Sequence, residues 1–86
     1  MVIIGIDPHP DSHTAAALDD NGKVLGQLVV LNDAVGLERL GAWMESYEVS
    51  KVAIEGANNP FARKFSTQLV HKGYQLLDIS PSLTSQ

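Results

Sequence analysis

Cysteine is absent from this 86-residue sequence, and its absence excludes disulfide bonds, zinc–thiolate sites and cysteine nucleophiles. Small domains without disulfides are typical of the reducing interior of the cell, so we expect a cytoplasmic location. No apolar run approaches the roughly 20 residues of a membrane-spanning helix, and no basic segment precedes an apolar one as in a signal peptide. We therefore expect a single small domain that does not associate with a membrane.

Basic residues are also few: six Lys and Arg stand against ten Asp and Glu, which gives a formal net charge of −4. This balance disfavours a broad phosphate-binding surface made by this chain alone. It is compatible with metal-dependent phosphoryl transfer, because that chemistry requires clustered carboxylates. The sequence contains neither G-x-G-x-x-G nor G-x-x-x-x-G-K-[ST], so dinucleotide-binding and P-loop folds have no support.

Three strand-like segments occupy the first third of the chain. Residues 2–7 form a continuous β-branched run, typical of a strand that is buried on both faces. The breaker cluster DPHPDS separates it from a second run, 13–18, and Asn21-Gly22 predicts a type I′ turn before a third run, 24–31. We expect these three strands to form an antiparallel meander.

The hydrophobic period then becomes helical. Apolar residues recur at helical spacing from 37 to 47, after an N-cap at Asn32 or Asp33. Residues 51–55 follow as a short apolar strand that ends on an acid.

A second helix and a fifth strand complete the pattern. Asn59 and Pro60 are suited to the N-cap and first position of a helix, and Gly73 is placed to end it. Residues 74–79 are the fifth expected strand.

The element order β-β-β-α-β-α-β predicts an α/β protein with a ribonuclease-H-like mixed sheet. The first strand is central in such a sheet, and the fourth lies parallel beside it after a right-handed crossover. We expect residues 1–80 to be the N-terminal part of a ribonuclease-H-like catalytic domain that is incomplete at its C-terminus. Residues 81–86 are expected to lead into a further segment.

Two acids end the two strands that we expect to be neighbours. Asp7 closes the first strand and Glu55 the fourth, so both belong at the carboxyl edge, where α/β sheets bind ligands. Two carboxylates ~4 Å apart repel by roughly 4 kcal/mol at an effective dielectric near 20, so such a pair requires a shared proton or cation. Asp7 alone is explained equally by a solvated turn, and the matching position of Glu55 is what favours a Mg²⁺ or Mn²⁺ site.

Polar residues beside Asp7 are candidates for contact with nucleic acid. His9 and His13 flank the expected site, and His9 and Ser12 are placed to meet a phosphate from the loop after the first strand. Solvated turn residues and simple strand alternation are the alternative interpretations.

The sequence as a whole resembles the N-terminal domain of the DEDD transposases, the insertion-sequence transposases of the family one-hundred-and-ten type. These are related to pilin-gene invertases and, in fold, to Holliday-junction resolvases of the Ruv-C kind. The most specific pieces are G-I-D-x-H at residues 5–9 and the strand–E–G–helix block from Val52 to Gly73. The resembling segments are GIDPHPDSHTAAALDDNGKVLG, LERLGAWM and VAIEGANNPFARKFSTQLVHKGYQLLDISPS.

The resemblance implies a recombinase that cuts and joins DNA phosphodiesters with Mg²⁺ held by four acids. By motif match, Asp7 is the first of these acids and Glu55 the second, and the other two are expected beyond Gln86. The resemblance also implies DNA and an element-encoded guide RNA as partners of the full-length protein, and an isolated fragment without activity. Family members commonly carry Lys soon after the first acid, where this chain has His9-Pro10.

Two alternatives of other classes stay open. Sugar kinases and actin-like ATPases share a ribonuclease-H-like core that begins with an acid-ended strand and a phosphate-contacting hairpin. Pro8 and Pro10 remove two backbone N–H donors from that hairpin, which counts against ATP binding. The second alternative is a non-catalytic scaffold that self-associates as a homo-oligomer through an exposed sheet edge.

Overall fold

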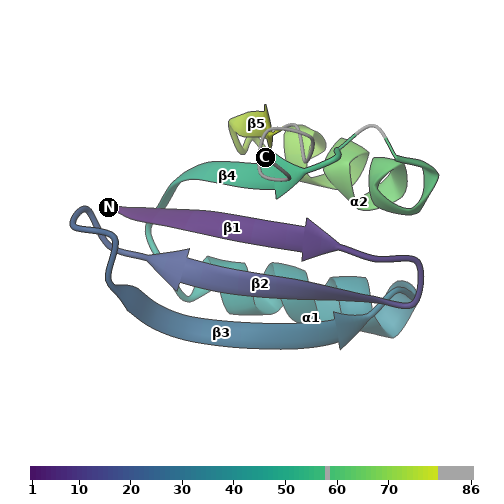
Figure 1. The fold of residues 1–86 in the computed structure, drawn as a ribbon, viewed down its shortest axis with the longest axis horizontal. Coiled ribbons are helices and arrows are strands. Elements are labelled where there is room, and N and C mark those ends of the chain that lie inside the picture. Colours follow the sequence, from purple (N-terminus) through teal and green to yellow (C-terminus); the bar gives the residue numbers. More distant parts are fainter. Residues whose placement is uncertain (58, 80–86) are drawn as a thin grey trace, which may run out of the picture.

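The computed structural model describes residues 1–57 and 59–79, and it shows the predicted order of strands and helices (Figure 1). Asn58 and the predicted tail 81–86 lie outside the described residues. The elements are β1 (Val2–Pro8), β2 (Ser12–Leu18), β3 (Val24–Leu31), α1 (Ala34–Glu45), β4 (Val49–Glu55), α2 (Pro60–His71) and β5 (Leu76–Ile79).

The five strands form one mixed sheet in the order β3-β2-β1-β4-β5. β1 and β3 pair with β2 in antiparallel fashion, whereas β4 pairs in parallel with β1 and β5 in parallel with β4. The predicted ribonuclease-H-like sheet, with β1 central and β4 parallel beside it, is therefore confirmed.

Both helices lie behind the sheet in Figure 1, and the handedness of the connections explains why. α1 connects β3 to β4 and α2 connects β4 to β5, so both connections join parallel strands and proceed in the same direction across the sheet. Right-handed connections that proceed in the same direction place their helices on the same face. The core between this face and the helices consists of Val2, Ile4, Ile6, Ala15, Ala17, Val30, Leu40, Met44, Val52, Ile54, Ala62, Phe65 and Leu69.

The opposite face, which we call the open face, is not covered by any helix in the described part of the chain (Figure 1). Residues of β1 alternate between the faces: Ile4 and Ile6 are buried under the helices, whereas Ile3 is 36% exposed and Asp7 is exposed. The prediction that this strand is buried on both faces is thus wrong for these residues, because a continuous apolar run does not reveal whether both sides are covered.

The turn between β2 and β3 differs from the predicted type I′ turn. A type I′ turn requires a positive φ at both central residues, yet only Gly22 has one, of 83°. The amide of Gly22 donates to the carbonyl of Asp19 at 3.0 Å, and the Asp19 carboxylate accepts from the amides of Asn21 and Lys23. These side-chain bonds favour a longer turn in which a single glycine supplies the left-handed conformation.

The helix ends follow the capping signals closely. Asp33, one of the two predicted N-caps, accepts a 2.7 Å hydrogen bond from the amide of Gly36. α1 ends at Glu45, so Tyr47 packs against the core from beyond the helix. Pro60 begins α2 as predicted, and Gly73 follows its end with a φ of +93°.

Two strands begin elsewhere than predicted. β4 starts at Val49, two residues earlier than the expected Lys51, and β5 starts at Leu76 rather than at Tyr74. Both differences concern the solvent-exposed entry of a strand, where hydrophobic pattern is a weak guide.

His13 is fully buried on the helix-covered face, although the sequence placed it beside the site. It lies opposite Pro8 and Val30 in the sheet, and its ring packs on Phe65 of α2 with 4.6 Å between the ring centroids. Neither ring nitrogen has a hydrogen-bond partner within the described residues. His13 thus serves as a core residue that leaves two polar atoms unpaired.

We predict that His13→Leu raises the free energy of unfolding by about 1 kcal/mol, because leucine fills a similar volume without unpaired polar atoms. Urea denaturation followed by circular dichroism measures the change. The exposed His71 provides the matched control, and His71→Leu is expected to change the free energy by less than about 0.5 kcal/mol. A destabilised His13→Leu variant would show that the imidazole has a structural partner.

A candidate metal site at the carboxyl edge of the sheet

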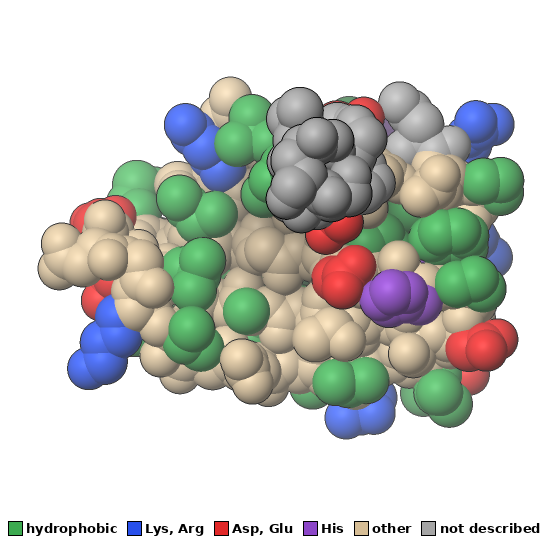
Figure 2. Space-filling view, viewed as in Figure 1, with side chains coloured by type: hydrophobic (Ala, Val, Ile, Leu, Met, Phe, Trp, Pro, Cys, Tyr) green, Lys and Arg blue, Asp and Glu red, His purple; other side chains and the backbone are tan. Residues whose placement is uncertain are grey.

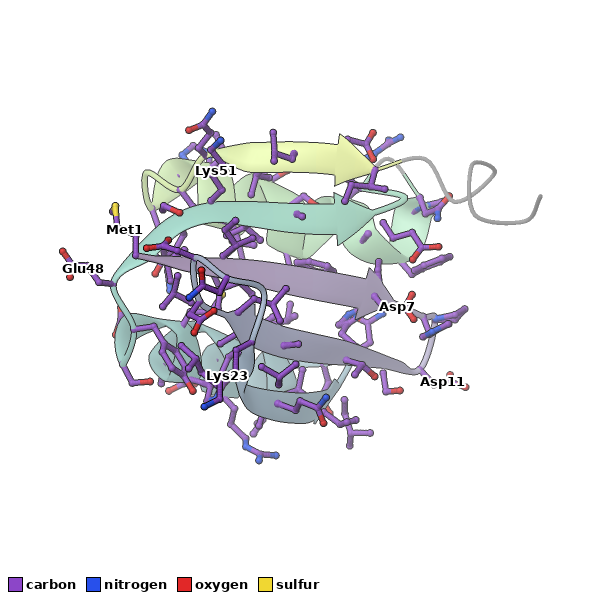
Figure 3. All side chains as sticks on the ribbon, turned by 60° about the vertical axis from the view of Figure 1, so that its left-hand side comes forward. Met1, Asp7, Asp11, Lys23, Glu48 and Lys51 are labelled. Atoms are coloured by element: carbon purple, nitrogen blue, oxygen red, sulfur yellow. The ribbon has the colours of Figure 1, made fainter. Side chains whose placement is uncertain are left out.

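Asp7 and Glu55 end the two central parallel strands at the same edge of the sheet. Ile6 lies opposite Ile54 in the β1–β4 register, so the residues that follow them leave the two strands side by side. Because side chains alternate along a strand, both acids belong to the face opposite the buried Ile6 and Ile54. Figure 3 shows Asp7 at the end of β1.

The two acids line one hollow of about 280 Å³ on the open face. Figure 2 shows acidic side chains (red) together with a histidine (purple) near the middle of that face. The neighbouring wall includes Thr14 from β2 and Ile79 from β5. The carboxylates therefore stand at a depression that opens to solvent.

Small residues form the floor of this hollow. Gly5 lies opposite Ala16 of β2 and Ala53 of β4, so the three form a row across the three central strands. A Cβ at Gly5 would meet no atom within 4 Å, which shows that the space above this row is empty. The sheet is thus deepest immediately beside the two acids.

Gly56 turns the chain away directly after Glu55. Its φ is +70°, a conformation that side chains other than glycine rarely adopt. Its amide donates to the carbonyl of Ile79 at 3.0 Å, which fastens the end of β4 to the end of β5. The position of Glu55 is therefore set by regular pairing up to the last residue of the strand.

His9 contacts the carboxylate of Asp7. The Nε2 atom of His9 lies 3.2 Å from Oδ2 of Asp7, and the two side chains are 59% and 55% exposed. The turn is closed by the amide of His9, which donates to the carbonyl of Ser12 at 2.9 Å. His9 consequently stands at the mouth of the hollow and occupies one oxygen of Asp7.

The other predicted site residues are distributed differently. Ser12 is partly buried at the start of β2 and does not line the hollow, whereas the exposed Thr14 does. The prediction that His13 flanks the site is wrong, because its position in β2 directs it to the helix-covered face. Sequence reasoning also missed the floor formed by Gly5 and Ala16, whose signal is small residues at matching strand positions.

The arrangement offers a partial set of metal ligands. Within residues 1–57 and 59–79, no group of three or more His, Asp or Glu side chains is suitably placed for a metal ion. Two carboxylates at an open edge fit the oxygen preference of Mg²⁺, which usually retains several waters and takes one or two carboxylates from the protein.

The match to a transposase family covers nearly the whole chain: the family model DEDD_Tnp_IS110, described as a transposase, matches residues 4–86. None of the curated proteins matches the sequence.

Solved structures with the same fold include two Holliday-junction resolvases. RuvC of Thermus thermophilus is 18% identical with a TM-score of 0.68, and 94% of this chain covers 64% of that protein. The resolvase of fowlpox virus is 13% identical with a TM-score of 0.68, and 95% of this chain covers 62% of it. This chain thus spans less than two thirds of either resolvase.

A sugar kinase shares the fold as well. The ROK family glucokinase of Streptomyces griseus, solved with glucose and AMPPNP, is 18% identical with a TM-score of 0.62, and 93% of this chain covers 33% of it. At these identities the likenesses establish the fold alone, so the fold does not separate a nuclease from a kinase.

We predict that His9→Ala changes the free energy of unfolding by less than about 0.5 kcal/mol, because exposed ion pairs contribute little. Urea denaturation measures the change, with wild type as the reference. A loss of more than about 2 kcal/mol would show that the contact with Asp7 holds the loop in place.

Proposed function

The chain belongs to the DEDD_Tnp_IS110 transposase family, and on this premise we propose that it is part of a catalytic domain that cuts and joins DNA with divalent metal. Residues 1–80 are proposed to form the N-terminal part of that domain. The observation that carries the proposal is the placement of Asp7 and Glu55 at the ends of neighbouring parallel strands, facing one hollow.

Asp7 and Glu55 would hold a Mg²⁺ or Mn²⁺ ion between them. Such an ion activates water for attack and offsets charge on the oxygens of a phosphodiester. The carboxylates position the ion at the sheet edge, and further acids from outside this chain complete its coordination. The low floor at Gly5 leaves room for a nucleic-acid backbone to approach the two acids.

His9 and Ser12 are proposed to contact the phosphate backbone. His9 stands at the mouth of the hollow, where its ring N–H is an exposed donor next to Asp7. Ser12 begins β2 at the other end of the same short loop. In this proposal His9 takes the place of the lysine that commonly follows the first acid in the family.

DNA, and an element-encoded guide RNA, are the proposed partners of the full-length protein. The net charge of −4 does not favour a phosphate-binding surface on this chain alone. Most of the affinity for nucleic acid is therefore assigned to segments beyond the ones described, and this chain contributes acids to the reaction centre.

An ATPase is the weaker alternative, although the fold itself is shared with a glucokinase. Phosphate-binding hairpins present backbone N–H groups to the nucleotide. Pro8 and Pro10 have no N–H, and the amide of His9 donates to Ser12 within the turn. The loop beside Asp7 thus retains few donors for a nucleotide phosphate.

We predict that Mn²⁺ broadens the NMR signals of residues around Asp7 and Glu55, and that Asp7→Asn or Glu55→Gln weakens this binding at least about tenfold. Each variant removes one of only two ligand carboxylates, so little coordination remains. Titration of the ¹⁵N-labelled chain with Mn²⁺ measures the affinity.

Asp11→Asn is the matched control for this titration. Asp11 is an exposed aspartate on the loop just beyond β1 (Figure 3), and its loss is expected to leave the Mn²⁺ affinity within about twofold. Equal weakening by all three substitutions would point to diffuse attraction between Mn²⁺ and acidic residues, and would overturn the site.

We also predict that the purified 86-residue chain does not cleave DNA in Mg²⁺ or Mn²⁺, because two carboxylates do not complete a two-metal centre. Incubation with supercoiled plasmid, supercoiled or branched DNA and analysis on a gel measures cleavage. In the full-length protein, Asp7→Asn and Glu55→Gln are each expected to lower the cleavage rate at least about 100-fold. Cleavage by the isolated chain that survives both substitutions would contradict the assignment.

A further inference from the structure

β3 forms the outer edge of the sheet, and one side of its backbone is unpaired. Its inner side pairs with β2 from Ser12 to Leu18. No strand pairs with its outer side in the described part of the chain, and Figure 1 shows no element beyond it. The outward N–H and C=O groups are therefore available to another strand.

The sequence of β3 lacks the usual protection of an edge strand. Natural edges are protected by short length, charged residues, prolines or bulges. β3 has eight residues, VLGQLVVL, without a charge or a proline. Its one irregularity in pairing lies near its start, opposite Ala17 and Leu18, and leaves the rest regular. The other edge, β5, has four residues and carries Asp78.

Aliphatic side chains of β3 stand exposed on the open face. Leu25, Val29 and Leu31 are 46%, 60% and 63% exposed. A second strand aligned along β3 would cover part of each, because side chains on one face of adjacent strands contact one another. α1 packs on the opposite face, where a Cβ at Gly26 would collide with the Tyr47 hydroxyl, so the strand is held in shape from behind.

Opposite charges stand at the two ends of β3. Lys23 precedes the strand and Asp33 follows it; Figure 3 shows Lys23 at the far end of the sheet from Asp11, whose carbonyl bonds to the amide of Asn32. Leu28 lies midway between Lys23 and Asp33 in the sequence. Antiparallel pairing of two copies about Leu28 therefore places each Lys23 beside the partner's Asp33, twice by symmetry.

We propose that β3 pairs in antiparallel fashion with β3 of a second copy of this chain, about a twofold axis at Leu28, and joins the two sheets into one. This charge pattern favours a second copy because the strand is complementary to itself. The pairing is independent of the metal site, since β3 and the two acids lie on different strands and β2 and β1 separate β3 from β4.

Sedimentation equilibrium tests the proposal with the 86-residue chain. We expect a weak dimer with a dissociation constant on the order of 100 μM, because one strand pair buries less than a standard interface. Val29→Lys is expected to weaken the dimer at least about tenfold by placing like charges across the new pair. A chain that stays monomeric up to about 1 mM would overturn the proposal.

Leu77→Lys is the matched control. Leu77 is 41% exposed on the open face of the other edge strand, β5. It should leave the dimer unchanged within about twofold if β3 is the interface. If Leu77→Lys abolished the dimer and Val29→Lys did not, association would occur elsewhere on the open face and the proposal would fail. Circular dichroism confirms that both variants fold.

A charge reversal tests the predicted register. Lys23→Asp places two acids together and is expected to weaken the dimer about threefold to tenfold, an effect that disappears at high salt. Asp33→Asn in the same chain should restore part of the affinity, because asparagine retains the N-cap of α1 without the charge. Equal weakening by Lys23→Asp with and without Asp33→Asn would exclude pairing about Leu28.

Discussion

The parallel pairing of β1 with β4 is the constraint on which the rest of this structure depends. Parallel strands cannot be joined by a tight turn, so the chain must travel through α1 before β4 reaches its place beside β1. The connection covers one face of the sheet with a helix and buries Ile4 and Ile54 beneath it. The same pairing aligns the carboxyl ends of both strands, which brings Asp7 next to Glu55 although 47 residues separate them in the sequence.

The acids and the core are thus two results of one register. Along β1, one set of alternating residues packs against the helices while the other set, which includes Asp7, faces the open side. A shift of the β1–β4 register by one residue would reverse both assignments at once. The electrostatic cost of adjacent carboxylates is therefore carried by packing on the opposite face of the sheet, where Ile6 and Ile54 are almost fully buried.

The sequence predicted element order, strand pairing and the ends of the helices well, because each has a local chemical signal. Asp33, Pro60 and Gly73 mark helix ends through hydrogen bonding and backbone preference. Properties that depend on what covers a face were not predictable in this way. The burial of His13 depends on the position of α2, and an apolar run such as β1 looks the same whether one face or both are covered.

The candidate site divides in the same manner. The two acids were predictable from their strand ends, and the family resemblance rested on the residues around them. The hollow was not predictable, because it arises from Gly5, Ala16 and Ala53 meeting across three strands, a match that only the register reveals.

Gly5 shows what this hollow costs the fold. Glycine in the interior of a strand is less stable than alanine by roughly 0.5–1 kcal/mol, because it loses more conformational freedom on folding. Nothing near Gly5 would obstruct a methyl group, so packing does not account for the glycine. The centre of the sheet therefore gives up a fraction of its stability to keep open the space beside its two acids.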